Sequence, residues 1–184
     1  MTVQKNKEPV RFIATFLILF LMFYYFNILF FGLTSPGSHY NSFLANHLNY
    51  IDWLRWVLLR SSVKILSFFS YTAIYNKYEL LVAGRGVIRL VYSCLGLGVM
   101  SFFTAFVIAY PKSLKHKLIF LICGLLSIQF LNVIRFVILA LFWDKRKSQI
   151  VDHHTLFNIF IYIAIIVSLY FWTKPSKTKA NAAN

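Results

Sequence analysis

The sequence predicts an all-α membrane protein, a polytopic helical bundle with four to five transmembrane helices. Hydrophobic residues make up 59% of the 184 residues and aromatic residues 19%, whereas soluble domains are roughly 45–50% apolar. Uncharged apolar runs recur along the chain. The 19 lysines and arginines, against 5 acidic residues, lie mainly beside these runs, as orientation charges do. We therefore expect one integral membrane domain over residues 1–184, with a lipid bilayer and not nucleic acid as its surroundings.

The first predicted span is residues 12–33, a run of about 22 residues without a charge, which is long enough to cross a bilayer. No small-residue cleavage site follows it, so we expect the helix to be retained and not cleaved as a signal peptide. Residues 34–49 begin with turn chemistry at Ser35 and Pro36 and contain no lysine or arginine. They are predicted to form a loop on the outer side.

Residues 50–75 are apolar but interrupted by charge. The charged residues are Asp52, Arg55, Arg60 and Lys64. Trp53 and Trp56 suit a position at the level of the lipid headgroups. We expect an interfacial or re-entrant helix that does not cross the bilayer. Residues 76–89 are predicted to be a polar connection that turns at 84–86.

Three further spans are predicted at residues 90–110, 118–143 and 155–172. A basic loop at 111–117 and a polar segment at 144–153 separate them. Residues 174–184 form a basic tail, which we expect to be disordered.

Three reactive groups are expected at one face of the membrane. The spans 90–110 and 118–143 must run in opposite directions, so the start of one and the end of the other lie on the same side. Cys94, Arg135 and the pair His153 and His154 should therefore share a shallow site. A thiol, a guanidinium and an imidazole are the nucleophile, anion stabiliser and base that acyl transfer needs.

These residues have simpler explanations that must be weighed. A free cysteine in an apolar run usually packs as a small hydrophobe. An arginine within a span is a stronger signal, because it costs at least about 2.5–3.5 kcal/mol at the centre of the bilayer. Asn132 shares its helix face, and Gly96 removes bulk close to Cys94. His153 and His154 beside Asp152 could simply cap the last helix.

Other chemistries are poorly supported. Cys94 and Cys123 form no CxxC pair, and Cys123 lies toward the opposite end of its span, so a disulfide or thiol-redox centre is not expected. A metal site is an alternative for His153, His154 and Asp152 together with the loop residues His39 and His47, but no tight ligand spacing supports it. No cofactor and no metal are therefore predicted.

Three motifs together resemble the exosortase/archaeosortase family, and the small size resembles its short, Bacteroidetes-type members. They are Ser93-Cys94-Leu95-Gly96-Leu97, Asn132-Val133-Ile134-Arg135 and Asp152-His153-His154. The resemblance covers residues 80–172, which would be the catalytic core. It implies that Cys94 is the nucleophile, with Arg135 and one histidine as its partners. His154 is preferred, because many members carry a small residue four positions after the histidine and Asn158 stands there.

The resemblance implies a membrane-embedded cysteine transpeptidase or protease that cleaves C-terminal sorting signals of exported proteins, for envelope attachment. It also implies the cytoplasmic (inner) membrane and an active site on the outer, periplasmic face, which corresponds to four spans. The distribution of flanking positive charge weakly favours five spans and a cytoplasmic site. The alternative function is a non-enzymatic scaffold or accessory subunit of an envelope export system. A weaker third is a transporter that uses Arg135 for an anion.

Overall fold

The computed structural model describes residues 7–36, 40–142 and 153–174, and only the backbone of residues 7 and 153–158. The chain divides into two units, Met1–Asp144 and Lys145–Asn184, and each is described by itself. In chain order the elements are α1 (Lys7–Thr34), α2 (Ser42–His47), α3 (Tyr50–Phe68), β1 (Ala73–Tyr75), β2 (Glu79–Val82), β3 (Gly86–Arg89), the 3₁₀ turn η1 (Tyr92–Leu95), α4 (Leu97–Ala109), α5 (Leu114–Phe142) and, in the second unit, α6 (His153–Thr173).

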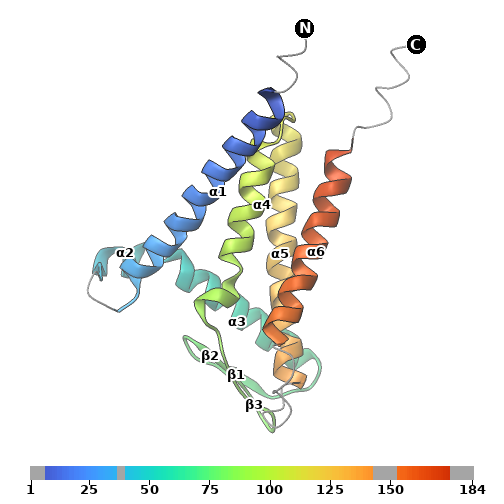
Figure 1. Ribbon diagram of the computed structural model, residues 1–184. Coiled ribbons are helices and arrows are strands. Elements are labelled where there is room, and N and C mark those ends of the chain that lie inside the picture. Colours follow the sequence, from blue (N-terminus) through green and yellow to red (C-terminus); the bar gives the residue numbers. More distant parts are fainter. Residues whose placement is uncertain (1–6, 37–39, 143–152, 175–184) are drawn as a thin grey trace. The chain divides into compact units, whose positions relative to one another are not determined.

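Three helices of the first unit pack side by side, with α4 between α1 and α5 (Figure 1). Phenylalanines hold α1 to α4: the ring of Phe12 meets Phe106 edge-on at 5.4 Å, and Phe16 meets Phe102 in the same way at 5.3 Å. Gly124 of α5 allows a close approach, because a Cβ there would lie 2.1 Å from the Phe103 ring of α4. The bundle is thus packed through aromatic rings and small residues.

Two of the described helices are long and apolar enough to cross a membrane, namely Glu8–Thr34 and Leu114–Phe142. Along α1 large apolar side chains are exposed, among them Ile18 at 67% and Leu29 at 63%. In water such a surface would be unfavourable, whereas hydrocarbon solvates it. Helix α4 and residues 159–173 of α6 are apolar but shorter, so the count of four to five spans stays a prediction.

Helix α3 is not one of these candidate spans. In Figure 1 it runs across the lower ends of α4 and α5, on the side where the sheet lies, and it packs against α5 and the strands. Leu58, Leu59 and Leu66 are buried on one face, while Trp53 and Trp56 are exposed on the other. This two-faced arrangement supports the prediction of an interfacial helix.

The prediction of an all-α fold is wrong in one region. Residues 73–89, expected to end α3 and then form a polar connection, make a three-stranded antiparallel sheet in the order β1-β2-β3. The reason is visible in β2, where Leu80 and Val82 are buried and Leu81 between them is exposed. This alternation has the period of a strand. The turn between β2 and β3 lies where it was predicted, at Gly84.

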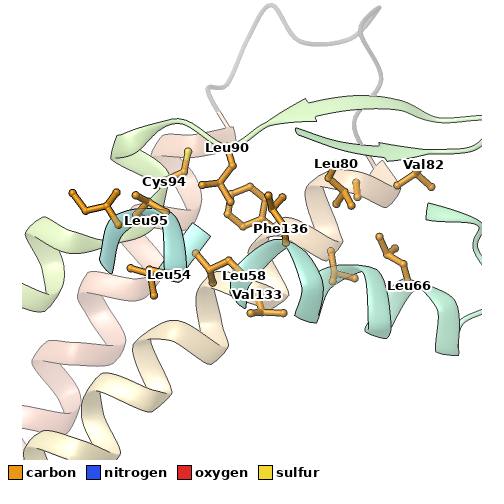
Figure 2. Close-up of a cluster of buried hydrophobic side chains, with 14 of the residues drawn as sticks. Leu54, Leu58, Leu66, Leu80, Val82, Leu90, Cys94, Leu95, Val133 and Phe136 are labelled. Atoms are coloured by element: carbon orange, nitrogen blue, oxygen red, sulfur yellow. The ribbon is translucent and has the colours of Figure 1, made fainter. Parts of the chain in front are cut away.

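The core of the first unit lies where α3, α5, the sheet and η1 meet. Figure 2 shows part of this buried cluster. Its members include Leu54 and Leu58 of α3, Leu80 of β2, Phe136 of α5, Leu90 after β3 and Cys94 in the 3₁₀ turn. Phe136 is 1% exposed and Leu95 is fully buried. Cys94 and Leu95, and with them the turn that carries the cysteine, therefore belong to the buried core of this unit.

The prediction that α3 is interfacial or re-entrant also predicts the topology of its two ends. Reporter domains fused after Asn41 and after Asn76 should report the same side of the membrane, because α3 does not cross. The measurement compares the enzyme activity of alkaline phosphatase fusions with the fluorescence of green fluorescent protein fusions at each of the two positions. Opposite sides would mean that α3 spans, which would make five spans and place Cys94 on the cytoplasmic face.

Candidate active site

Cys94 does not lie within the helix that the sequence predicted. Residues 90–110 were expected to be one span, but α4 begins only at Leu97, and Cys94 lies in the preceding 3₁₀ turn. Its backbone N–H donates to the carbonyl of Val91 at 3.0 Å. Gly96 then takes a left-handed conformation with φ of 74°, which a continuous helix cannot contain. The chain therefore bends directly after the cysteine.

The structure brings Cys94 and Arg135 together. Arg135 of α5 donates from Nη2 to the Cys94 Sγ across 3.8 Å, although 41 positions separate the two residues. Both are buried, with exposed fractions of 2% for Cys94 and 3% for Arg135. The contact therefore places a guanidinium against a buried thiol, and it joins two of the residues that the sequence predicted to share one site.

A polar stripe on α5 extends this contact. Gln129, Asn132 and Arg135 follow each other at intervals of three and so lie along one face of the helix. Asn132 Nδ2 donates to the Leu95 carbonyl at 3.4 Å, and Gln129 Nε2 donates to the same oxygen at 3.3 Å. These bonds hold the backbone next to Cys94 against α5.

Gln129 was missed in the sequence. It is a single uncharged polar residue in an apolar run, so composition gives it no weight. The available signal was its register, three residues before Asn132 on the face of Arg135. Its amide also lies 2.7 Å from the Met100 sulfur of α4, so it joins the cysteine turn, α4 and α5.

Gly96 allows the close approach between this turn and α5. A Cβ at this position would lie 2.5 Å from Asn132 Nδ2, which is closer than van der Waals contact permits. Ser93, on the other side of Cys94, is exposed. The glycine predicted to remove bulk near the thiol therefore does so toward Asn132.

Replacing Gly96 with alanine is expected to destabilise the protein by about 2–4 kcal/mol, from left-handed strain and the displacement of Asn132. The matched control is Gly98→Ala, since a Cβ there would meet only Tyr24 at 3.7 Å and alanine favours a helix. Thermal unfolding in detergent measures both variants. Equal melting temperatures for the two would contradict this role of Gly96.

The predicted histidines cannot be placed at the site. His153 and His154 are the first residues of α6, which begins two positions before the span predicted at 155–172. Their side chains, and all of Asp152, lie outside the described residues. Helix α6 also belongs to the second unit. The role of His154 as base therefore stays a prediction.

The two cysteines are in different environments, and neither forms a disulfide: Cys94 is buried and Cys123 is exposed. Within the described ranges no cluster of three histidine, cysteine or acidic side chains is arranged to hold a metal. Of the proposed metal ligands, His39, His153, His154 and Asp152 are not covered by that search.

Comparison with known proteins gives one family match. A protein-family model described as transmembrane exosortase (Exosortase_EpsH) matches residues 9–172, which is most of the chain. No curated protein and no solved structure matches significantly.

Proposed function

Since the chain belongs to the transmembrane exosortase family, we propose that it is a membrane-embedded cysteine transpeptidase or protease. It would cleave the C-terminal sorting signals of exported proteins, for attachment to the cell envelope. The observation that carries this proposal is the buried contact between Cys94 Sγ and Arg135 Nη2. A cysteine that only fills space in the core needs no cation beside it. A buried guanidinium within a span costs free energy and usually marks a functional site.

In this reaction the Cys94 thiolate attacks the carbonyl carbon of the scissile peptide bond. Arg135 stabilises the negative charge, first on the sulfur and then on the carbonyl oxygen. His154 takes the thiol proton and returns it to the leaving amine, which departs with the C-terminal tail. The thioester that remains is opened by water, which gives a carboxylic acid, or by an amine, which gives a new amide. The chain's own residues suffice for these steps.

The geometry of the turn supports the role of Cys94. A nucleophile is most effective when it is held in one position, and packing together with the bonds from Gln129 and Asn132 hold this one. The adjacent carbonyl of Leu95 is occupied by those two amides. Movement of the turn would therefore have to break several interactions at once.

We place the site on the outer face of the cytoplasmic membrane, where a tail of an exported protein would meet it. An interfacial α3 agrees with this placement: with four spans and an N-terminus inside, the start of α4 lies on the outer face. The substrate would then present its hydrophobic segment alongside the bundle, with its basic end toward the cytoplasm.

A second candidate is a scaffold or accessory subunit of an envelope export system. The specific observation in its favour is the burial of Cys94, since only 2% of the residue is exposed. A nucleophile must be reached by its substrate, whereas a scaffold residue need not be. The loss or retention of processing in Cys94 variants separates the two candidates.

The proposed function is tested with exported proteins of the same cell that end in an apolar segment followed by basic residues. His154→Ala is expected to stop their clipping, because the thiol loses its base, whereas His153→Ala retains it. The ratio of full-length to clipped substrate on immunoblots gives the result. Clipping that continues in both variants and in the double variant would exclude a histidine base. Identical ratios with and without the protein would exclude the function.

A further inference from the structure

A cavity of about 570 Å³ lies next to the cysteine turn, and the proposed reaction does not use it. It is lined by the end of α1, residues 35, 36 and 40, helix α2, the start of α3, the turn between β1 and β2, and residues 89–92. Its size is within the range of small-molecule sites, about 300–1,000 Å³. Cys94 is not among its lining residues, but Val91, whose carbonyl accepts from the Cys94 N–H, is one.

The charge of the cavity is positive. Arg55, Lys77 and Arg89 line it, against the single carboxylate of Asp52. Asp52 pairs with both Arg55 and Lys77, and its second oxygen is 2.8 Å from Lys77 Nζ. The hydrogen bond to Asp52 raises the pKa of Lys77 above its ordinary value, so the lysine stays charged. In the described part of the chain Arg89 makes no ion pair. Three cations and one anion leave a net charge of +2.

Arg55 is the most informative of these residues. It is 4% exposed and its Cζ lies 4.7 Å from the centre of the Tyr78 ring. Its Nε has no hydrogen-bond partner among the described residues, although the atom is buried. A buried N–H of a cation is rarely left unused, because its desolvation is uncompensated. Arg55 is one of the residues that line the cavity, so this incompletely satisfied buried cation belongs to the cavity wall.

The position of the cavity points to the membrane surface. Thr34, at the end of the candidate span Glu8–Thr34, lines it. Helix α3, whose start also lines it, exposes Trp53 at 64% and Trp56 at 43%, and tryptophan is enriched at the level of the headgroups. The ligand that is abundant at this depth and carries an anionic group is a phospholipid.

We propose that this cavity binds the phosphate of an anionic lipid headgroup, with Arg55, Lys77 and Arg89 as the cationic contacts. Arg55, which pairs with Asp52, places a buried positive charge in the cavity wall, and the exposed Lys77 and Arg89 supply the donors that a phosphate can reach. The side chains of Asn46, Asn49 and Tyr40 line the same space and offer hydrogen bonds to the remainder of the headgroup. The bound lipid would fix residues 89–92, and with them the turn of Cys94, to the bilayer surface.

The test compares two double variants of the full-length protein in nanodiscs of phosphatidylcholine. Lys77→Gln with Arg89→Gln removes two exposed charges from the cavity. Arg60→Gln with Lys64→Gln removes two exposed charges from α3 that do not line it. Binding of spin-labelled phosphatidylglycerol is measured from its immobilised fraction. We expect at least about a tenfold loss of affinity in the first variant and less than about twofold in the second.

Further measurements on the same proteins identify the ligand. Inorganic phosphate at millimolar concentration should not displace the lipid, whereas displacement at micromolar concentration would show a site for free phosphate and overturn the lipid assignment. Equal losses in both double variants would show attraction by surface charge alone. An acidic peptide that binds with high affinity where phosphatidylglycerol does not would show a peptide site. Native melting temperatures in both variants exclude unfolding as the cause. None of these results depends on clipping activity, so the proposed function can fail or hold independently.

Discussion

Cys94→Ser is expected to abolish clipping of the C-terminal tail, by at least about a thousandfold, while the protein remains folded and inserted. The change replaces sulfur with oxygen in a buried side chain of nearly the same size, so the packing around it is kept. An alcohol is a far weaker nucleophile than a thiolate, and one histidine and one arginine do not compensate for this difference. The full-length to clipped ratio of the substrate measures the loss.

Cys123→Ser is the matched control, because it makes the same substitution at an exposed position on α5. It should clip at the wild-type level. Normal clipping by Cys94→Ser at wild-type protein abundance would end the cysteine mechanism and leave the scaffold as the better candidate. Loss of clipping together with loss of the protein from the membrane would instead assign Cys94 a packing role.

Arg135→Lys has the second-largest expected effect, a loss of about a hundred- to a thousandfold in clipping, although the positive charge is kept. Arg135 is buried and donates to Cys94 Sγ through one arm of its guanidinium. A lysine has a compact ammonium on a more flexible stem and cannot reproduce the planar, multi-donor guanidinium at that point. The measurement is the rate at which a newly synthesised cohort of substrate loses its C-terminal tail.

Arg60→Lys provides the control for this change. Arg60 is exposed on α3, where its guanidinium lies 4.7 Å from the centre of the Trp56 ring, and lysine can replace it there at small cost. Wild-type clipping by Arg135→Lys would show that charge alone suffices and that Arg135 does not contact the reacting atoms. Slow substrate clipping by the Arg60→Lys variant would show that the measurement reports membrane insertion and not the role of Arg135.

The main helices could be predicted from the sequence because the signal is local. Long apolar runs, uncharged for α1 and interrupted only by Arg135 for α5, predict these helices to within a few residues of their observed bounds. The charged residues and two tryptophans of α3 mark it as different. The order of the runs also made it possible to expect Cys94 near Arg135, since consecutive antiparallel helices bring the start of one to the end of the next. The exosortase family was predicted from the motifs around Cys94, Arg135 and His154, and the family match confirms that prediction.

The strands could not be predicted in this way. Each is three or four residues long, too short for a periodic pattern, and each is stabilised by pairing with the others and by Leu80 and Val82 packing into the core. The start of α4 was missed for a related reason. Nothing in the run 90–110 shows that Gly96 is left-handed or that Asn132, 36 positions later, lies against it.

What the sequence by itself determined is the set of apolar helices and the identity of the reactive residues, because both depend on the chemistry of neighbouring positions. Only the tertiary structure decided the 3₁₀ turn of Cys94, its contact with Arg135, the bonds from Gln129 and Asn132, and the cationic cavity beside them. Arg55, Lys77 and Arg89 come from α3, a turn and the end of β3, and each alone reads as an ordinary flanking charge. They become a site only because packing brings three separate elements to one cavity.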